Sequence, residues 1–139
     1  MSKYTELKAK HQAEVNAFPF GFAFNDKQFA EMMAKWGLTP EDTDKLFDLG
    51  YGTYIRKTDA DAYKTMMGRH RIEMKMVIKK NEDDFLFHMF NYELANHEYS
   101  YTYELDDTLD ALGLTIEEIN ANPTMADALK RAIAAQEDM

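Results

Sequence analysis

The sequence predicts a mainly α protein, a compact helical domain around a central buried helix with a minor two-stranded β ribbon. Residues 85–94 are apolar on nearly every face of a helix, so this segment is expected at the centre of the core. Apolar residues recur at helical spacing over residues 3–16 and 59–80. Aromatic residues alternate with small ones over residues 20–24, which is typical of a short strand.

The composition fits a single domain over residues 1–139. A chain with 45% hydrophobic and 29% charged residues can bury a core without cross-links. It has no cysteine, which excludes disulfides and thiolate metal sites. No apolar run approaches the roughly 18 residues of a membrane span, and residues 1–10 do not resemble a signal peptide. We therefore expect a cytoplasmic protein that does not interact with membranes.

Two helices are predicted in the N-terminal part of the chain. The helix over residues 3–16 places His11 on its apolar face, where a packed histidine is expected rather than a ligand. Asn25 has the properties of a helix N-cap, with Gln28 as its capping-box partner, and this second helix is expected to end at Trp36.

A corner is predicted where Gly37 and Leu38 precede Thr39-Pro40. Threonine as N-cap and proline at the first helical position predict a new helix that ends near residues 49–50. Similar residues recur as Gly-Leu-Thr at positions 113–115. We therefore expect two similar αα corners.

The middle of the chain predicts a strand and a long helix. Residues 53–57 are rich in strand formers and are expected to pair with residues 20–24. The helix over residues 59–80 is the only basic element, and it is the natural internal partner for an acidic surface.

The C-terminal part predicts a central helix and several short elements. The central helix spans residues 83–96. The alternating tyrosines over residues 99–103 are either an extended segment or the frayed end of that helix, and we expect the extended segment. Short helices are expected at 108–112 and 116–121. Thr115 is expected to cap the helix at 116–121, and Thr124 is expected to cap the last helix.

The charge is strongly asymmetric along the chain. Residues 1–82 carry 14 basic and 12 acidic side chains, whereas residues 83–139 carry 13 acidic side chains and two basic ones. The C-terminal half is therefore not expected to bind nucleic acid, because phosphate contacts need cations. Three interpretations stay open: a surface that confers solubility, a surface that packs on the basic helix 59–80, and a surface presented to a basic partner.

A polar group interrupts the C-terminal end of the central helix. Glu93 and His97 are separated by four residues and share a helix face, and Asn96 lies beside them. The spacing matches neither of the helical metal-binding motifs, H-E-x-x-H and E-x-x-H. We expect Glu93, Asn96 and His97 to form a polar network that fixes the end of the helix, with no metal and no cofactor.

Three segments resemble a known family: FAFNDKQF at 22–29, YIRKTD at 54–59, and the stretch over 92–120 that begins YELANHEYSYT. The sequence is similar to small proteins of about this length that are carried on phages, plasmids and integrated mobile elements of anaerobic bacteria. The similarity covers almost the whole chain, and it implies a biological context rather than catalytic residues, because that family has no established activity. Relatives tend to carry cysteine where Ser100 stands, so thiol chemistry could not operate here.

The acidic half and this context together favour a protein that binds a host protein over an enzyme. It would inhibit a defence or nucleic-acid-handling protein, in the manner of an anti-CRISPR or a DNA mimic, without binding nucleic acid itself. Carboxylates would replace phosphates, and tyrosines would anchor the contact because large rings bind at small entropic cost. The candidate residues are Glu98, Tyr99, Tyr101, Tyr103, Glu104, Asp106, Asp107, Asp110, Glu117 and Glu118.

Two alternatives come from other classes of protein. A metal-binding protein or enzyme would use His97 with Glu93 and Glu98, where a helical Glu–His pair could act in acid–base chemistry. A structural or dimerising protein would use the ten methionines and the many aromatic residues for adaptable apolar contacts, which leaves a homodimer open.

Overall fold

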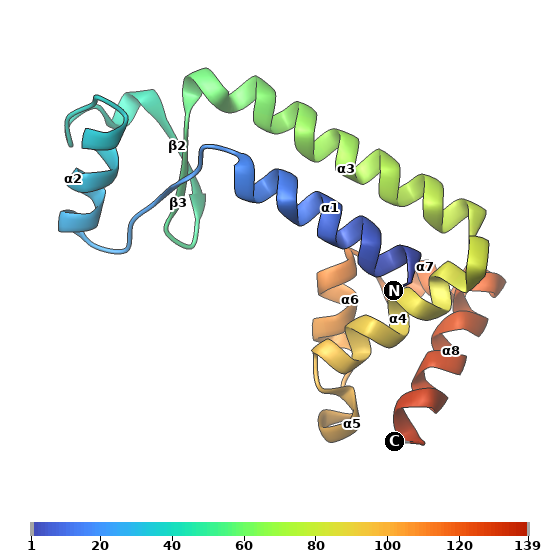
Figure 1. Cartoon of the computed structure of the whole chain (residues 1–139). Helices are drawn as coiled ribbons and strands as arrows, with labels where there is room; N and C mark the ends of the chain where they lie inside the picture. The colour runs from blue at the N-terminus through green and yellow to red at the C-terminus, as the bar shows by residue number, and fades with distance from the viewer. Residues whose placement is uncertain (1, 139) are drawn as a thin grey trace. The chain divides into compact units, whose positions relative to one another are not determined.

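The computed structural model describes residues 2–138, and these form a mainly α protein, as predicted (Figure 1). Eight α-helices and one small antiparallel sheet are present in the described chain. The chain divides into two compact units. We call residues 11–72 the sheet unit, and residues 1–10 together with 73–139 the helical unit. Helices α1 (Lys3–Ala17) and α3 (Ala60–Lys80) each contribute residues to both units.

The helical unit is built around α4 (Phe85–Asn96), which confirms the predicted central buried helix. Met89, Phe90 and Leu94 on this helix are fully buried. Helix α8 (Pro123–Glu137) packs along α4, and its buried face includes Leu129 (Figure 1). Three short helices complete the unit: α5 (Tyr99–Thr102), α6 (Asp106–Leu112) and α7 (Ile116–Asn120).

The sheet unit contains a three-stranded sheet and helix α2 (Asp26–Lys35). The strands are β1 (Gly21–Phe22), β2 (Leu46–Gly50) and β3 (Thr53–Arg56), in the order β1-β3-β2. The predicted pairing of the first aromatic strand with the strand at 53–57 is confirmed, with Gly21 opposite Tyr54. Gly21 allows α2 to approach closely, because a Cβ there would lie 2.4 Å from Met32 Sδ.

The helix predicted over residues 40–49 is wrong. A 3-10 turn, η1 (Thr43–Lys45), leads directly into β2. Asp42 accepts a hydrogen bond from the Thr39 backbone N–H at 2.8 Å, so the Thr-Pro sequence makes a local turn instead of a helix start. The ribbon therefore has three strands, and the first of the two expected αα corners is absent.

A glycine-based hairpin explains this difference. Residues 50–52 all have positive φ, between 55° and 88°, and they reverse the chain between β2 and β3. Two glycines in such a turn favour a hairpin between the flanking apolar segments. Hairpin pairing with β3 therefore prevails over the helix-start signal at Thr39.

Two further predictions in the C-terminal part are wrong in detail. The segment predicted to be extended, 99–103, begins with the four-residue helix α5, because Tyr99 is buried in the core and fixes one helical turn there. The last helix is capped by Asn122, whose Oδ1 accepts the Met125 N–H at 3.2 Å, with Pro123 at the first helical position. Thr124 therefore lies inside the helix and is not its cap.

The other capping predictions are confirmed. Asn25 Oδ1 accepts the Gln28 N–H at 2.8 Å, and the Gln28 side chain accepts the Phe24 N–H at 2.8 Å. Thr115 Oγ1 accepts the Glu118 N–H at 3.1 Å at the start of α7. Two 3-10 turns lead into helices: η2 (Lys57–Asp59) precedes α3, and η3 (Glu82–Asp84) precedes α4.

Candidate functional site

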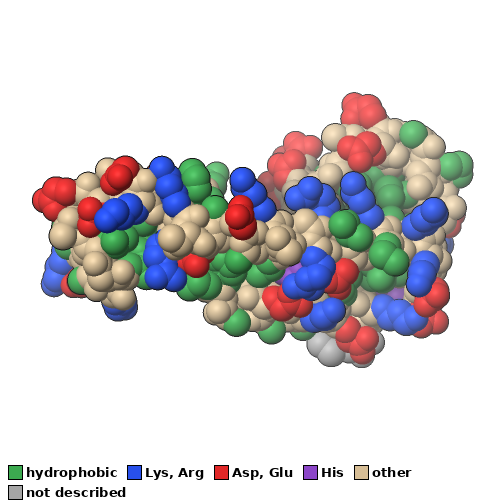
Figure 2. Space-filling model, turned by 90° about the horizontal axis from the view of Figure 1, so that it is seen from above, with side chains coloured by type: hydrophobic (Ala, Val, Ile, Leu, Met, Phe, Trp, Pro, Cys, Tyr) green, Lys and Arg blue, Asp and Glu red, His purple; other side chains and the backbone are tan. Residues whose placement is uncertain are grey.

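Seven carboxylates of the helical unit form the first part of the candidate site, and we call them the acidic face. They lie on or beside the three short helices: Glu98, Glu104, Asp106, Asp107, Asp110, Glu117 and Glu118. All seven are exposed. Hydrophobic side chains also reach the surface of the molecule between charged ones, as Figure 2 shows for one side.

The carboxylates of the acidic face lie in a part of the sequence that has no cationic residues. Residues 81–129 contain no lysine and no arginine. Among the residues that the structure describes, none of the seven carboxylates forms an ion pair with a lysine or arginine of the helical unit. Other acids of the same unit do have partners: Asp84 receives two hydrogen bonds from Arg131, at 2.8 and 2.9 Å. The Arg131 guanidinium keeps the pKa of Asp84 below its usual value.

The three tyrosines of the predicted site differ in accessibility. Tyr101 is 85% exposed and Tyr103 is 65% exposed. Tyr99 is buried in the core, so its ring is not available at the surface as the other two are. Its ring centroid lies 5.8 Å from that of Tyr103 in an edge-to-face contact, so Tyr99 supports an exposed aromatic neighbour.

Both ends of α5 have strained backbone. Glu98 before the helix and Tyr103 after it have φ of 57° and 58°, in the left-handed region that side chains with a Cβ disfavour. The Tyr103 N–H donates to the Tyr99 carbonyl at 2.8 Å and closes the turn. Tyr103 directly precedes Glu104 of the acidic face in the sequence.

A groove lies between α6 and the start of α7. Its volume is about 480 Å³, and its apolar lining consists of Leu105, Leu109, Leu114 and Ile116. Asp106 and Asp110, one helical turn apart on α6, also line it. The sequence predictions included both carboxylates but missed the aliphatic residues. The signal was present as aliphatic side chains that alternate with acids over residues 104–118.

The predicted polar network at the end of α4 centres on Glu93. This carboxylate is buried, and its Oε1 accepts a hydrogen bond from Lys8 Nζ of α1 at 2.6 Å. His97 Nε2 lies 3.8 Å from Glu93 Oε2. The Glu93 carboxylate and burial both raise the pKa of Tyr4, burial being the larger cause. Asn96 is exposed, and the ion-pair partner of the buried Glu93 carboxylate is the partly exposed Lys8, which the sequence did not indicate.

The geometry does not bring together a metal-binding group. Within residues 2–138, no cluster of three or more His, Cys, Asp or Glu side chains could hold an ion. Glu93 is already engaged by an ammonium group, and Glu98 is exposed beyond the helix end.

None of the helices within residues 2–138 has the length and apolar character of a membrane span.

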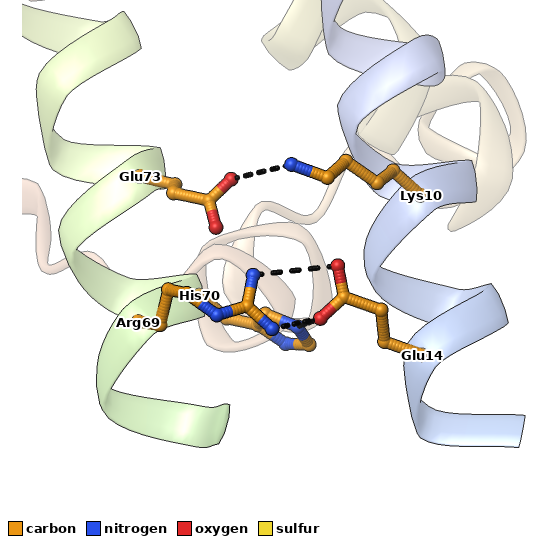
Figure 3. Close-up of polar contacts among 5 residues, drawn as sticks. All are labelled: Lys10, Glu14, Arg69, His70 and Glu73. Carbon is orange, nitrogen blue, oxygen red and sulfur yellow. Dashed lines mark hydrogen bonds and ion pairs between the residues drawn. The ribbon is translucent and has the colours of Figure 1, made fainter. Parts of the chain in front are cut away.

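The sheet unit contains a second polar cluster, which the sequence did not indicate. The rings of His11 on α1 and His70 on α3 are stacked with centroids 3.9 Å apart. Glu14 binds both the Arg69 guanidinium and the His70 imidazole, whose Nε2 lies 3.0 Å from its Oε2 (Figure 3). Arg69 above all, and then His70, lower the Glu14 pKa to about 2. His11 is a packed histidine, as predicted.

In the helical unit, Lys10 Nζ lies 3.1 Å from Glu73 Oε2, and this ion pair again joins α1 to α3 (Figure 3). In each unit, therefore, a charged residue of α1 forms an ion pair with a charged residue of α3. The sequence could not reveal these pairs, since their members are 55 to 63 residues apart.

Fold and site together define a small, mainly helical protein with an uncompensated acidic surface beside an apolar groove. The model of a family of unknown function, DUF7659, matches residues 3–135. The chain belongs to this family. No curated protein and no solved structure matches the chain.

Proposed function

We propose that the protein acts by binding another protein, and that the acidic face receives a basic surface of that partner. The observation that carries the proposal is the set of seven exposed carboxylates within 49 residues, 81–129, that contain no lysine or arginine. Uncompensated like charges destabilise a folded unit through self-repulsion, and a cationic partner would relieve that repulsion.

The class of partner follows from the chemistry of the carboxylates. Proteins that bind nucleic acid present lysine and arginine to phosphates, and the same cations bind carboxylates in charge-assisted hydrogen bonds. A partner that handles nucleic acid therefore has the complementary surface. The resemblance to proteins of phages, plasmids and mobile elements supports a host target, and inhibition of host defence is the function we propose for the contact.

Two exposed tyrosines favour a protein as the partner of the acidic face over small counterions alone. Tyr101 and Tyr103 flank the carboxylates, and tyrosine is frequent at the energetic centres of protein interfaces. Tyr99 is excluded from this contact because it is buried.

The test is an affinity capture from nuclease-treated host lysate with the full-length protein as bait. A variant with Glu104→Gln, Asp106→Asn, Asp107→Asn and Asp110→Asn removes four charges of the acidic face. A matched control removes four exposed charges of the sheet unit: Glu31→Gln, Glu41→Gln, Asp44→Asn and Asp61→Asn. Captured proteins are identified by mass spectrometry, and each is purified for DNA-binding assays.

The proposal expects a nucleic-acid-binding protein that the wild type and the control capture and the acidic-face variant does not. The wild type should also compete with DNA for that protein. Capture that is equal for all three baits, or a captured protein whose DNA binding is unaffected, would contradict it.

A further inference from the structure

We infer that the groove between α6 and α7 seats a large apolar side chain from a basic amphipathic helix of the partner. The inference rests on the proposed function, because it assigns the contact element of the same binding surface. Four aliphatic side chains line the groove, and two carboxylates stand beside them.

The size of the groove fits an inserted side chain. Its volume of about 480 Å³ lies within the range of roughly 300–1,000 Å³ that is typical of ligand sites. Leu109 belongs to the core, whereas Ile116 is 38% exposed and leaves part of the apolar wall uncovered. Filling the groove would remove this aliphatic surface from water.

The walls of the groove are held in place by backbone hydrogen bonds. Gly113, with φ 67°, turns the chain between the two helices, and the Leu114 N–H donates to the Leu109 carbonyl at 3.0 Å. Thr115 caps α7 and fixes the position of Ile116 at its first residue. A site that is already formed in the free protein loses little conformational entropy on binding.

Charge complementarity determines the chemistry of the occupant. Asp106 and Asp110 lie one turn apart on α6, and like charges at this spacing destabilise a helix. Glu117 and Glu118, both exposed, directly follow the groove residue Ile116 in the sequence. An acidic segment, a nucleic acid or an anionic membrane would be repelled. A helix with lysine or arginine one turn either side of a large apolar residue would satisfy both the groove and the carboxylates.

The test uses two 18-residue helical peptides of equal charge as probes. One has leucine along one helical face and lysine elsewhere, and the other has serine in place of every leucine. Titration calorimetry at fixed salt measures the affinity of each peptide for three full-length proteins: the wild type, Ile116→Ser and the control Ile72→Ser. The control changes an exposed isoleucine of the sheet unit.

We expect the wild type and Ile72→Ser to bind the leucine peptide at least about tenfold more tightly than the serine peptide. Ile116→Ser should lose this preference and keep its affinity for the serine peptide. In amide NMR spectra of the wild type, the leucine peptide should shift the signals of Leu105, Leu114 and Ile116. This measurement does not depend on the folding of a variant.

Three results would overturn the inference. Equal binding of both peptides would reject the groove but leave the acidic face as a site for basic partners. Binding of neither peptide would also remove the electrostatic basis of the proposed function. A wild-type dimer that Ile116→Ser dissociates, measured by sedimentation, would assign the groove to a second copy of the chain.

Discussion

The two units of the molecule carry equal numbers of lysines and arginines, eight each, but very different numbers of acids. The helical unit has sixteen aspartates and glutamates, and the sheet unit has nine. The helical unit also has the larger core, a cluster of thirteen buried hydrophobic residues against four in the sheet unit. The comparison indicates that uncompensated charge is placed where hydrophobic burial is most extensive and can best offset the repulsion.

The largest loss of stability is expected from a cavity in the core of the helical unit. Phe90 is fully buried at the centre of α4, so Phe90→Ala should lower the free energy of unfolding by about 3–5 kcal/mol. Urea denaturation followed by circular dichroism measures the loss. Phe24→Ala, at an exposed phenylalanine of the sheet unit, is the control and should cost less than about 1 kcal/mol.

The same variant tests whether residues 1–139 behave as a single domain, as we predict. Helices α1 and α3 each run through both units without a break, which should couple their unfolding. Trp36, the one tryptophan of the chain, lies in the sheet unit and reports on it by fluorescence. Phe90→Ala should therefore shift the Trp36 transition as much as the overall helical signal. An unshifted Trp36 transition would show that the units unfold independently.

A smaller effect is expected from the strained backbone beside the acidic face. Tyr103→Gly should raise the free energy of unfolding by about 1 kcal/mol, because glycine adopts the left-handed conformation without a Cβ clash. Tyr101→Gly, within α5 and not among the positive-φ residues, should instead lower it by about 0.5–1 kcal/mol. Thermal unfolding of the two variants gives the comparison. Destabilisation by Tyr103→Gly would mean that its ring contact with Tyr99 outweighs the strain.

Relief of the charge repulsion should have a modest effect. Asp110→Asn should stabilise the protein by about 0.2–0.5 kcal/mol at low salt, since Asp106 lies one turn before it and no described lysine or arginine of the helical unit forms an ion pair with either carboxylate. The gain should diminish at high salt because exposed charges are screened. Asp84→Asn, which removes the charge of one of the two carboxylates that bind Arg131, should destabilise the same unit. A stabilising effect of both variants would indicate a response to net charge alone.

The smallest effect concerns the ionised cluster of the sheet unit. Arg69 and then His70 lower the Glu14 pKa from 4.5 to about 2. Because the folded pKa lies below the unfolded one, the stabilisation is fully present above about pH 4.5 and is lost as the pH falls towards 2. The melting temperature of Glu14→Gln should therefore lie below that of the wild type at pH 6 and converge with it near pH 2. A pH-independent difference would contradict this account.

The parts of the fold that the sequence predicts are those determined locally. The apolar run at 85–94 identified the core helix, and Asn25 and Thr115 identified helix starts, because caps and periodicity act within a few residues. Strand β2 was missed since pairing with β3 decides its conformation. The stacking of His11 on His70 and the Lys8–Glu93 bond join residues far apart in the chain, so no local pattern contained them.

The acidic face could be predicted because acids without neighbouring cations can be counted in the sequence. The groove beside it could not, because it depends on how Gly113 turns the chain. Tyr99 illustrates the limit of such reasoning. Its alternation with Tyr101 and Tyr103 predicted equivalent roles, but the helical turn of α5 places its ring in the core.

The absence of lysine and arginine from residues 81–129 also limits which proteases can cleave this segment and which modifications it can carry. Trypsin, which cleaves after those residues, can release the acidic face only as one fragment of 50 residues, from Asn81 to Lys130. Acetylation, methylation and ubiquitination of lysine cannot occur within the segment. Any modification of lysine on this chain must therefore lie outside residues 81–129, the segment that contains the acidic face.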